Sequence, residues 1–228
     1  MVRLPNVLRD SMITAFRQIV CERNEIIPFL HQAEWWAATD GARILDVEAD
    51  DGVDVRLSDN TVVRRALAPR HGGRARVVAD LGAFKIGKSF GAAIWAAAFA
   101  AIPHARVQLI GLEYDICEPE FTYIVEALLS SRDGKPPLIS KYSSLQNRPR
   151  DGRMYLDLDN GARFEAKSWE RKDTLKGKEI DCFVYCEAYM LTGMEVFTDF
   201  SQNLRARDGF AVFPTTPDRP WVQEFHDC

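Results

Sequence analysis

The chain has 228 residues, of which 46% are hydrophobic and 27% are charged, as is ordinary for a folded water-soluble protein. This length suits a single α/β domain with a sizeable core. The formal net charge of −4 gives no overall sign of nucleic-acid binding, although basic residues cluster locally. No apolar run is long enough to span a membrane, and the N-terminus lacks a signal-peptide pattern. The five cysteines and four histidines are scattered, which favours free thiols in a reducing cytoplasm and argues against a metal site built from side chains alone.

The first elements in chain order are two helices. Residues 6–23 carry apolar side chains at helical intervals, and a second helix rich in aromatic residues is expected after Pro28. Within it, Gln32 could present its amide to adenine, accepting a hydrogen bond from N6 and donating one to N7. The alternative is a surface glutamine on a helix packed by Trp35 and Trp36, but a phosphate loop further along the chain favours adenine.

Residues 43–67 alternate between apolar and polar side chains, which predicts a β-meander with turns at 50–52 and 58–60. A dense basic stretch follows the last of its strands. Its arginines are candidate contacts to the nucleic-acid backbone or to a neighbouring subunit's nucleotide. A solvated loop balanced by nearby aspartates is an equally good interpretation. The DNA-binding candidates are Arg64, Arg65, Arg70 and Arg74.

The stretch 82–89 fits the phosphate-binding pattern G-x-x-x-x-G-K-[ST], between an expected strand at 76–81 and an expected buried helix at 90–101. In such a loop, backbone N–H groups converge on phosphate oxygens. Lys88 would contact the β- and γ-phosphates of ATP, and the Ser89 hydroxyl would ligate Mg²⁺. The expected nucleotide-binding residues are Gln32, Gly82, Ala83, Phe84, Lys85, Ile86, Gly87, Lys88 and Ser89.

The following elements complete an α/β pattern. A buried strand at 106–112 precedes a helix at 119–129, and loops are expected over 131–151. A hairpin is expected at 154–166 around Asn160-Gly161, and a further buried strand begins near Phe210. The predicted fold is therefore a P-loop NTPase of the ASCE or recA-like type. It has a mainly parallel central sheet flanked by helices, with the β-meander inserted before the P-loop.

The strand at 180–185 carries the expected catalytic group, because it ends at Cys186-Glu187. Ligands of open α/β sheets lie at the carboxyl ends of the strands, so Glu187 is placed to orient and deprotonate an attacking water. An ordinary strand-end acid is the alternative. Cys186 occupies the position where an aspartate usually holds Mg²⁺, and Asp181 lies near the other end of the strand. The hydroxyls of Thr215 and Thr216 could sense the γ-phosphate.

Four elements in one order resemble the ATPase domain of the large terminase subunit, which packages double-stranded DNA into tailed-phage capsids. They are Pro28-Phe29-x-x-Gln32, the P-loop, Leu175-Lys176-Gly177 leading to Glu187, and Thr215-Thr216-Pro217. The resemblance implies that Glu187 and Lys88 are catalytic and that Thr215 and Thr216 couple hydrolysis to DNA movement. It also implies an arginine that enters a neighbour's site, for which Arg171 is the candidate.

By the same resemblance, the expected function is an ATP-hydrolysing motor with ATP and Mg²⁺ at its site. It would act in the host cytoplasm with double-stranded DNA, the portal protein and the small terminase subunit, as a homo-oligomeric ring, expected to be a pentamer, on the portal. Residues 1–228 are expected to form one ATPase domain: a helical adenine region at 1–42, the meander at 43–70 and the core at 71–228. The family's nuclease domain is absent from these residues.

Three features depart from the family pattern: Ala83 where an arginine is common, Cys186 in place of the metal-holding aspartate, and the absent nuclease domain. The meander at 43–67 also looks like an insertion. Two other functions stay open. One is a different helicase-like P-loop ATPase, although nothing in the sequence supplies the second lobe of such enzymes. The other is a nucleotide-binding assembly module with weak or no hydrolysis, which the cysteine favours.

Overall fold

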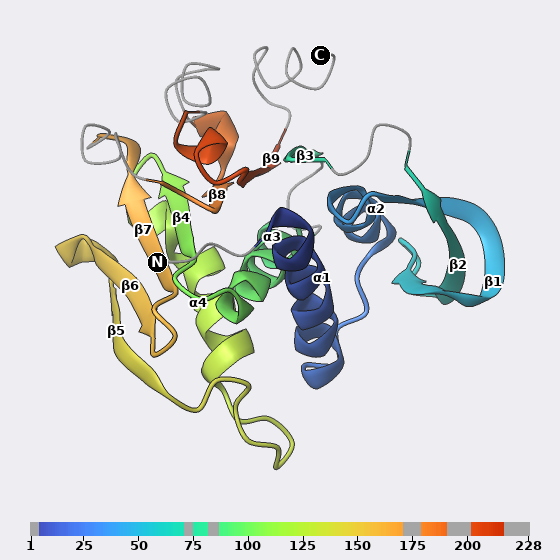
Figure 1. Ribbon diagram of the computed structural model, residues 1–228, viewed down its shortest axis with the longest axis horizontal. Coiled ribbons are helices and arrows are strands. Elements are labelled where there is room, and N and C mark those ends of the chain that lie inside the picture. The colour runs from blue at the N-terminus through green and yellow to red at the C-terminus, as the bar shows by residue number, and fades with distance from the viewer. Residues whose placement is uncertain (1–4, 71–74, 82–86, 171–178, 191–201, 217–228) are drawn as a thin grey trace.

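A computed structural model describes residues 5–70, 75–81, 87–170, 179–190 and 202–216. Figure 1 shows a central sheet with helices packed beneath it and a separate two-stranded ribbon at one side. The α-helices are α1 (Asn6–Arg23), α2 (Leu30–Thr39), α3 (Lys88–Ala97) and α4 (Glu118–Leu129). Short 3₁₀ segments are η1 (Ala98–Ala101), η2 (Asp115–Cys117), η3 (Pro149–Asp151) and η5 (Ala188–Met190). The strands are β1 (Ala42–Arg56), β2 (Val62–Pro69), β3 (Val77–Leu81), β4 (Arg106–Gly111), β5 (Tyr142–Arg148), β6 (Arg153–Leu158), β7 (Arg163–Ser168), β8 (Cys182–Tyr185) and β9 (Phe210–Thr215).

The central sheet has seven strands in the order β3-β9-β8-β4-β7-β6-β5. The strands from β3 to β7 are parallel, whereas β6 and β5 continue the sheet as antiparallel strands at one edge. The expected mainly parallel α/β sheet is therefore confirmed. Residues of β8 and β9 are buried throughout, as is typical of parallel strands covered on both faces.

Helix α3, which follows the predicted P-loop, is the centre of the core. Its Trp95 is 1% exposed and makes edge-on contacts with Trp35, Phe99 and Phe210, with ring centroids 5.2–5.8 Å apart. The indole of Trp95 also donates a hydrogen bond of 3.1 Å to the Thr39 hydroxyl, so its buried N–H is satisfied. This packing joins α2, the C-terminal half of α3 and the start of β9.

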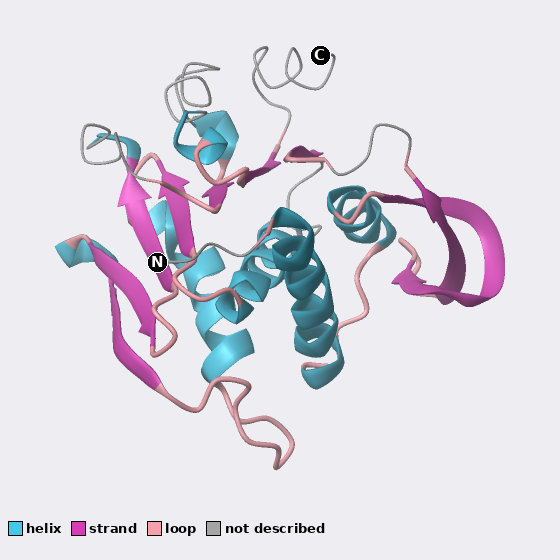
Figure 2. Cartoon of the chain, in the orientation of Figure 1, coloured by secondary structure: helices cyan, strands magenta, loops and turns pink. Residues whose placement is uncertain are grey.

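The inserted segment differs from the predicted meander. It is a two-stranded antiparallel ribbon of β1 and β2, which Figure 2 shows beside α2 and apart from the main sheet. The stretch 50–52, predicted as a turn, lies inside β1, where the pairing register shifts between Glu48 and Val53. These residues stay within one long strand because β1 pairs with β2, in a shifted register, on both sides of them. Residues 131–151 also differ from expectation, since they contain β5.

Candidate nucleotide site

Lys88, Thr215 and Glu187, three of the predicted site residues, lie at the edge of the sheet where the parallel strands end. The P-loop follows β3, Thr215 ends β9, and Glu187 follows β8 by two residues. Strand β9 lies between the other two, with Leu81 paired to Thr215 and Val184 paired to Val212. The strand order therefore sets the end of β9, with Thr215, between the end of β3 and the turn that carries Glu187.

Lys88 and Ser89 begin α3 at this edge. The preceding Gly87 has a left-handed backbone (φ 85°), a conformation that glycine adopts without steric cost. The lysine side chain is buried, and its charge acts on Asp80 of β3. Burial raises the pKa of Asp80 to about 6, while the charge of Lys88 and the nearby Trp35 indole lower it. An acid near the end of β3 thus interacts with the lysine that is predicted to bind phosphate.

Gln32 contacts the P-loop directly. Its Nε2 donates to the Gly87 carbonyl at 2.7 Å, and its Oε1 accepts from the Phe29 backbone N–H at 3.0 Å. A Cβ at either Gly87 or Gly91 would meet this amide at 3.0 Å, a tight contact, so glycine at both positions gives the amide room for its close approach. Gln32 therefore links the start of α2 to Gly87 by hydrogen bonds, a contact that the sequence did not predict. Its contact with adenine stays a prediction.

Glu187 lies on the turn after β8 in a left-handed conformation (φ 46°), which is uncommon for a residue with a side chain. Its carboxylate oxygen Oε2 is enclosed by protein. Two residues further on, the Tyr189 backbone N–H donates to the Thr215 hydroxyl at 2.8 Å. This hydrogen bond joins the end of β9 to the turn that carries Glu187. Thr216, which follows, is 6% exposed.

The residues beside Glu187 do not supply the usual metal-holding aspartate. Burial raises the pKa of the Cys186 thiol well above its ordinary value, so this side chain stays a neutral thiol. Asp181 lies at the opposite end of β8, where its Oδ2 accepts from the Arg106 N–H and from Arg207, both at 2.8 Å. Asp181 is therefore a structural residue at the start of the strand, as expected.

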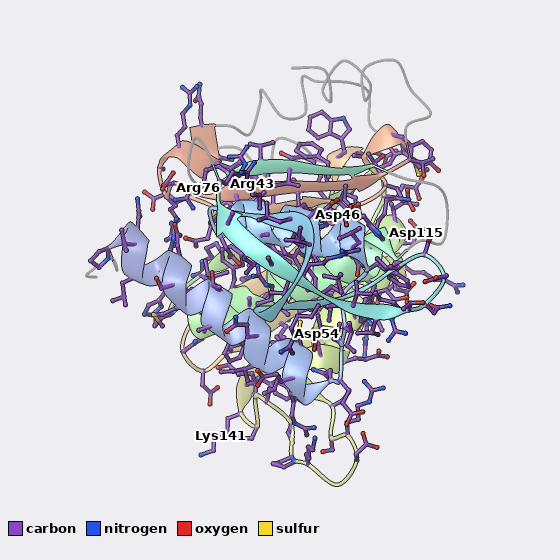
Figure 3. All side chains as sticks on the ribbon, turned by 90° about the vertical axis from the view of Figure 1, so that its right-hand side faces the viewer. Arg43, Asp46, Asp54, Arg76, Asp115 and Lys141 are labelled. Atoms are coloured by element: carbon purple, nitrogen blue, oxygen red, sulfur yellow. The ribbon has the colours of Figure 1, made fainter. Side chains whose placement is uncertain are left out.

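The arginines predicted to contact DNA lie on the ribbon and just after it. Arg64 pairs with Asp54 at 2.8 Å, and Arg65 pairs with Asp46 at 3.0 Å. Figure 3 shows Asp46 and Asp54 on the ribbon, on the side that faces the viewer. These ion pairs reduce the net positive charge that Arg64 and Arg65 present, whereas Arg70 is exposed at the end of the ribbon.

Several predicted site residues fall outside the described ranges: Gly82, Ala83, Phe84, Lys85, Ile86, Arg74, Arg171, the Leu-Lys-Gly element and Pro217. Within those ranges, no group of three or more His, Cys, Asp or Glu side chains could hold a metal ion. None of the described helices is long and apolar enough to cross a membrane.

Sequence reasoning missed one acidic residue at this edge, Glu120 in the first turn of α4. It is 1% exposed and adjoins Ser89 and Cys186. A signal was present, because Glu120 shares the helix face of Ile124 and Leu128, at intervals of four residues. A carboxylate on an otherwise apolar helix face indicates a buried polar contact.

The sheet order, in which β9 separates the P-loop strand from the carboxylate strand, is that of ASCE-type ATPase domains. Among solved structures, the chain is similar to the large terminase ATPase domain of Thermus phage P74-26. An arginine-to-alanine variant of that domain matches with a TM-score of 0.51 and 27% identity, over 66% of this chain and 63% of that one. The unmodified domain matches with a TM-score of 0.50 and 26% identity, over 68% and 65% respectively.

The predicted resemblance to a terminase ATPase domain is thus confirmed as a structural similarity, and the chain matches just under two thirds of those domains. No protein-family model and no curated protein matches the chain.

Proposed function

We propose that this chain is an ATP-hydrolysing motor domain that drives double-stranded DNA into a phage prohead. The observation that carries the proposal is the strand order β3-β9-β8, which gathers Lys88, the two threonines and Glu187 at one sheet edge. Similarity to a terminase ATPase domain supports the same function. The motor would work in the host cytoplasm as a ring, expected to be a pentamer, on the portal, with the portal protein and the small terminase subunit as partners.

In this proposal, each group at the edge has one task in hydrolysis. Lys88 binds the β- and γ-phosphates, and Glu187 orients the attacking water and accepts its proton. Mg²⁺, when bound at Ser89, neutralises charge on the phosphate oxygens. Arg171 is the candidate that reaches a neighbouring subunit's site. These roles suit groups held at the end of a rigid parallel sheet, because in-line attack needs accurate positioning.

Thr215 and Thr216 are proposed to couple hydrolysis to DNA movement. The Thr215 hydroxyl accepts a hydrogen bond from the Tyr189 backbone N–H, two residues after Glu187. A shift of the turn that carries Glu187 would therefore move the end of β9. Strand β9 in turn pairs with β3, which leads into the P-loop. Loss of the γ-phosphate could therefore change the position of β9 through these hydrogen bonds.

The test of the nucleotide site is Lys88→Ala. We expect the dissociation constant for ATP to rise by about 10–100-fold, since a hydrogen bond to a charged group contributes about 1.5–3 kcal/mol. Binding of a fluorescent ATP analogue and release of phosphate would be measured with and without duplex DNA. Lys141→Ala is the matched control, because Lys141 is exposed and directly precedes β5, which is at the opposite edge of the sheet from β3. Equal binding by both variants would contradict the proposal.

The DNA contact has a separate test, in which Arg64, Arg65, Arg70 and Arg74 are all replaced by glutamine. Each phosphate contact adds about 0.9 to the slope of log K against log salt, so loss of these contacts should flatten that slope by about 2 to 4. The measurement is binding to a short duplex between about 50 and 200 mM salt. An unchanged slope would remove these four arginines from the DNA interface.

A further inference from the structure

Glu120 is a buried acid whose only nearby described donors are two weak neutral groups, the Ser89 hydroxyl and the Cys186 thiol. It lies in the first turn of α4, is 1% exposed, and neither Oε1 nor Oε2 accepts a hydrogen bond from a described residue. Burying a carboxylate without a partner is costly, so natural proteins pair such groups with donors, cations or metals. The arrangement therefore indicates a positively charged ligand that the described residues do not supply.

The surroundings of Glu120 place that ligand at the nucleotide site. Helix α4 follows β4 through η2 and packs beside α3, so its first turn lies at the carboxyl edge of the sheet (Figure 1). Burial raises the pKa of Glu120, the nearby Ser89 hydroxyl and Cys186 thiol lower it, and the charge of Glu187 raises it. Glu120 is therefore next to the serine expected to ligate Mg²⁺.

Cys186 is a poor ligand for Mg²⁺, whereas Glu120 has the carboxylate that Mg²⁺ prefers. A neutral thiol is a soft and weak ligand, whereas Mg²⁺ prefers oxygen and carboxylate oxygen above all. Mg²⁺ at nucleotide sites is usually held by one or two carboxylates together with phosphates and waters. Ser89 and Glu120 would complete such a donor set without an aspartate after β8.

We propose that Glu120 supplies the carboxylate that holds Mg²⁺ at the Ser89 site, directly or through a coordinated water, in place of the aspartate whose position Cys186 occupies. The acid thus comes from the helix after β4 instead of from the end of β8. This inference rests on the proposed nucleotide-binding function.

The test compares the Mg²⁺ dependence of nucleotide binding in the full chain. For Glu120→Gln, we expect the Mg²⁺ concentration that gives half-maximal binding of a fluorescent non-hydrolysable ATP analogue to rise tenfold or more. Binding in EDTA should stay within about threefold, since the phosphate contacts of the P-loop are untouched. Adding Cys186→Asp to this variant should restore the wild-type Mg²⁺ requirement. Glu118→Gln is the control, because Glu118 lies in the same turn of α4 but is exposed.

Thermal unfolding separates this role from a purely structural one. In EDTA, Glu120→Gln should keep or raise Tm, because it removes a buried charge, but it should lose the Tm increase that Mg²⁺ and the analogue give together. A lower Tm in EDTA with an unchanged Mg²⁺ requirement would overturn the inference and leave nucleotide binding intact. Failure of the wild-type chain to bind the analogue under any condition would instead overturn the proposed function and the Mg²⁺ site together.

Discussion

Glu187→Gln is expected to lower the rate of ATP hydrolysis by about 10²–10⁴-fold, the range typical for loss of a general base. The amide keeps the size of the side chain but cannot take a proton from water. Nucleotide affinity should change little, because the P-loop contacts do not involve Glu187. The measurement is steady-state phosphate release with duplex DNA present, together with equilibrium binding of a fluorescent ATP analogue.

The matched control for this prediction is Glu113→Gln, an exposed acid two residues after β4 at the same sheet edge. Its turnover should equal that of the unmodified chain. If Glu187→Gln hydrolysed ATP at the normal rate, Glu187 would have no catalytic role. If the unmodified chain bound nucleotide tightly with no turnover under any condition, including with DNA and partners, the assembly-module interpretation would be favoured instead.

The sequence was sufficient to predict the helices and strands that a periodic pattern of apolar residues marks. The helices at 6–23 and 119–129 and the strands that lead to Lys88 and Glu187 were all predicted within a few residues of their observed bounds. Their apolar periodicity differs between helix and strand, and a buried parallel strand is apolar on both faces. Because ligands meet at the carboxyl ends of such strands, the location of the site followed from the same signals.

The features that the sequence did not predict depend on contacts between distant residues. A turn was expected at 50–52 because Asp-Asp-Gly is typical of turns, but pairing with β2 on both sides keeps this stretch within β1. The hydrogen bond from Gln32 to Gly87 joins residues 55 positions apart. Glu120 could be judged only once α4 was seen to set it beside Ser89. The order of residues along a short stretch of sequence does not show any of these three contacts.

A buried ion cluster ties α1 to the opposite end of the sheet from the nucleotide site. Asp10 of α1 is 3% exposed and accepts from Arg9 at 3.1 Å and from Arg76 at 2.8 Å. Arg76, just before β3, also pairs with Asp208 at 2.6 Å and lies 4.3 Å from the ring centre of Phe210. The cluster thus fixes the starts of β3 and β9, whose far ends carry the P-loop and the threonines.

Asp10→Ala should therefore destabilise the fold by about 3–5 kcal/mol, the usual effect of removing one partner from a buried ion cluster. Two guanidinium groups would lose their shared carboxylate, and one of them, on Arg9, is itself buried. Asp54→Ala is the control, because its pair with Arg64 is about half exposed on both sides, and such pairs contribute about 0–1 kcal/mol. Urea unfolding monitored by tryptophan fluorescence would measure both variants, with similar m-values expected. A loss below about 1 kcal/mol for Asp10→Ala would show that α1 is not needed to fix β3 and β9. The predicted loss would instead make the N-terminal helix part of the structure that holds the nucleotide site in place.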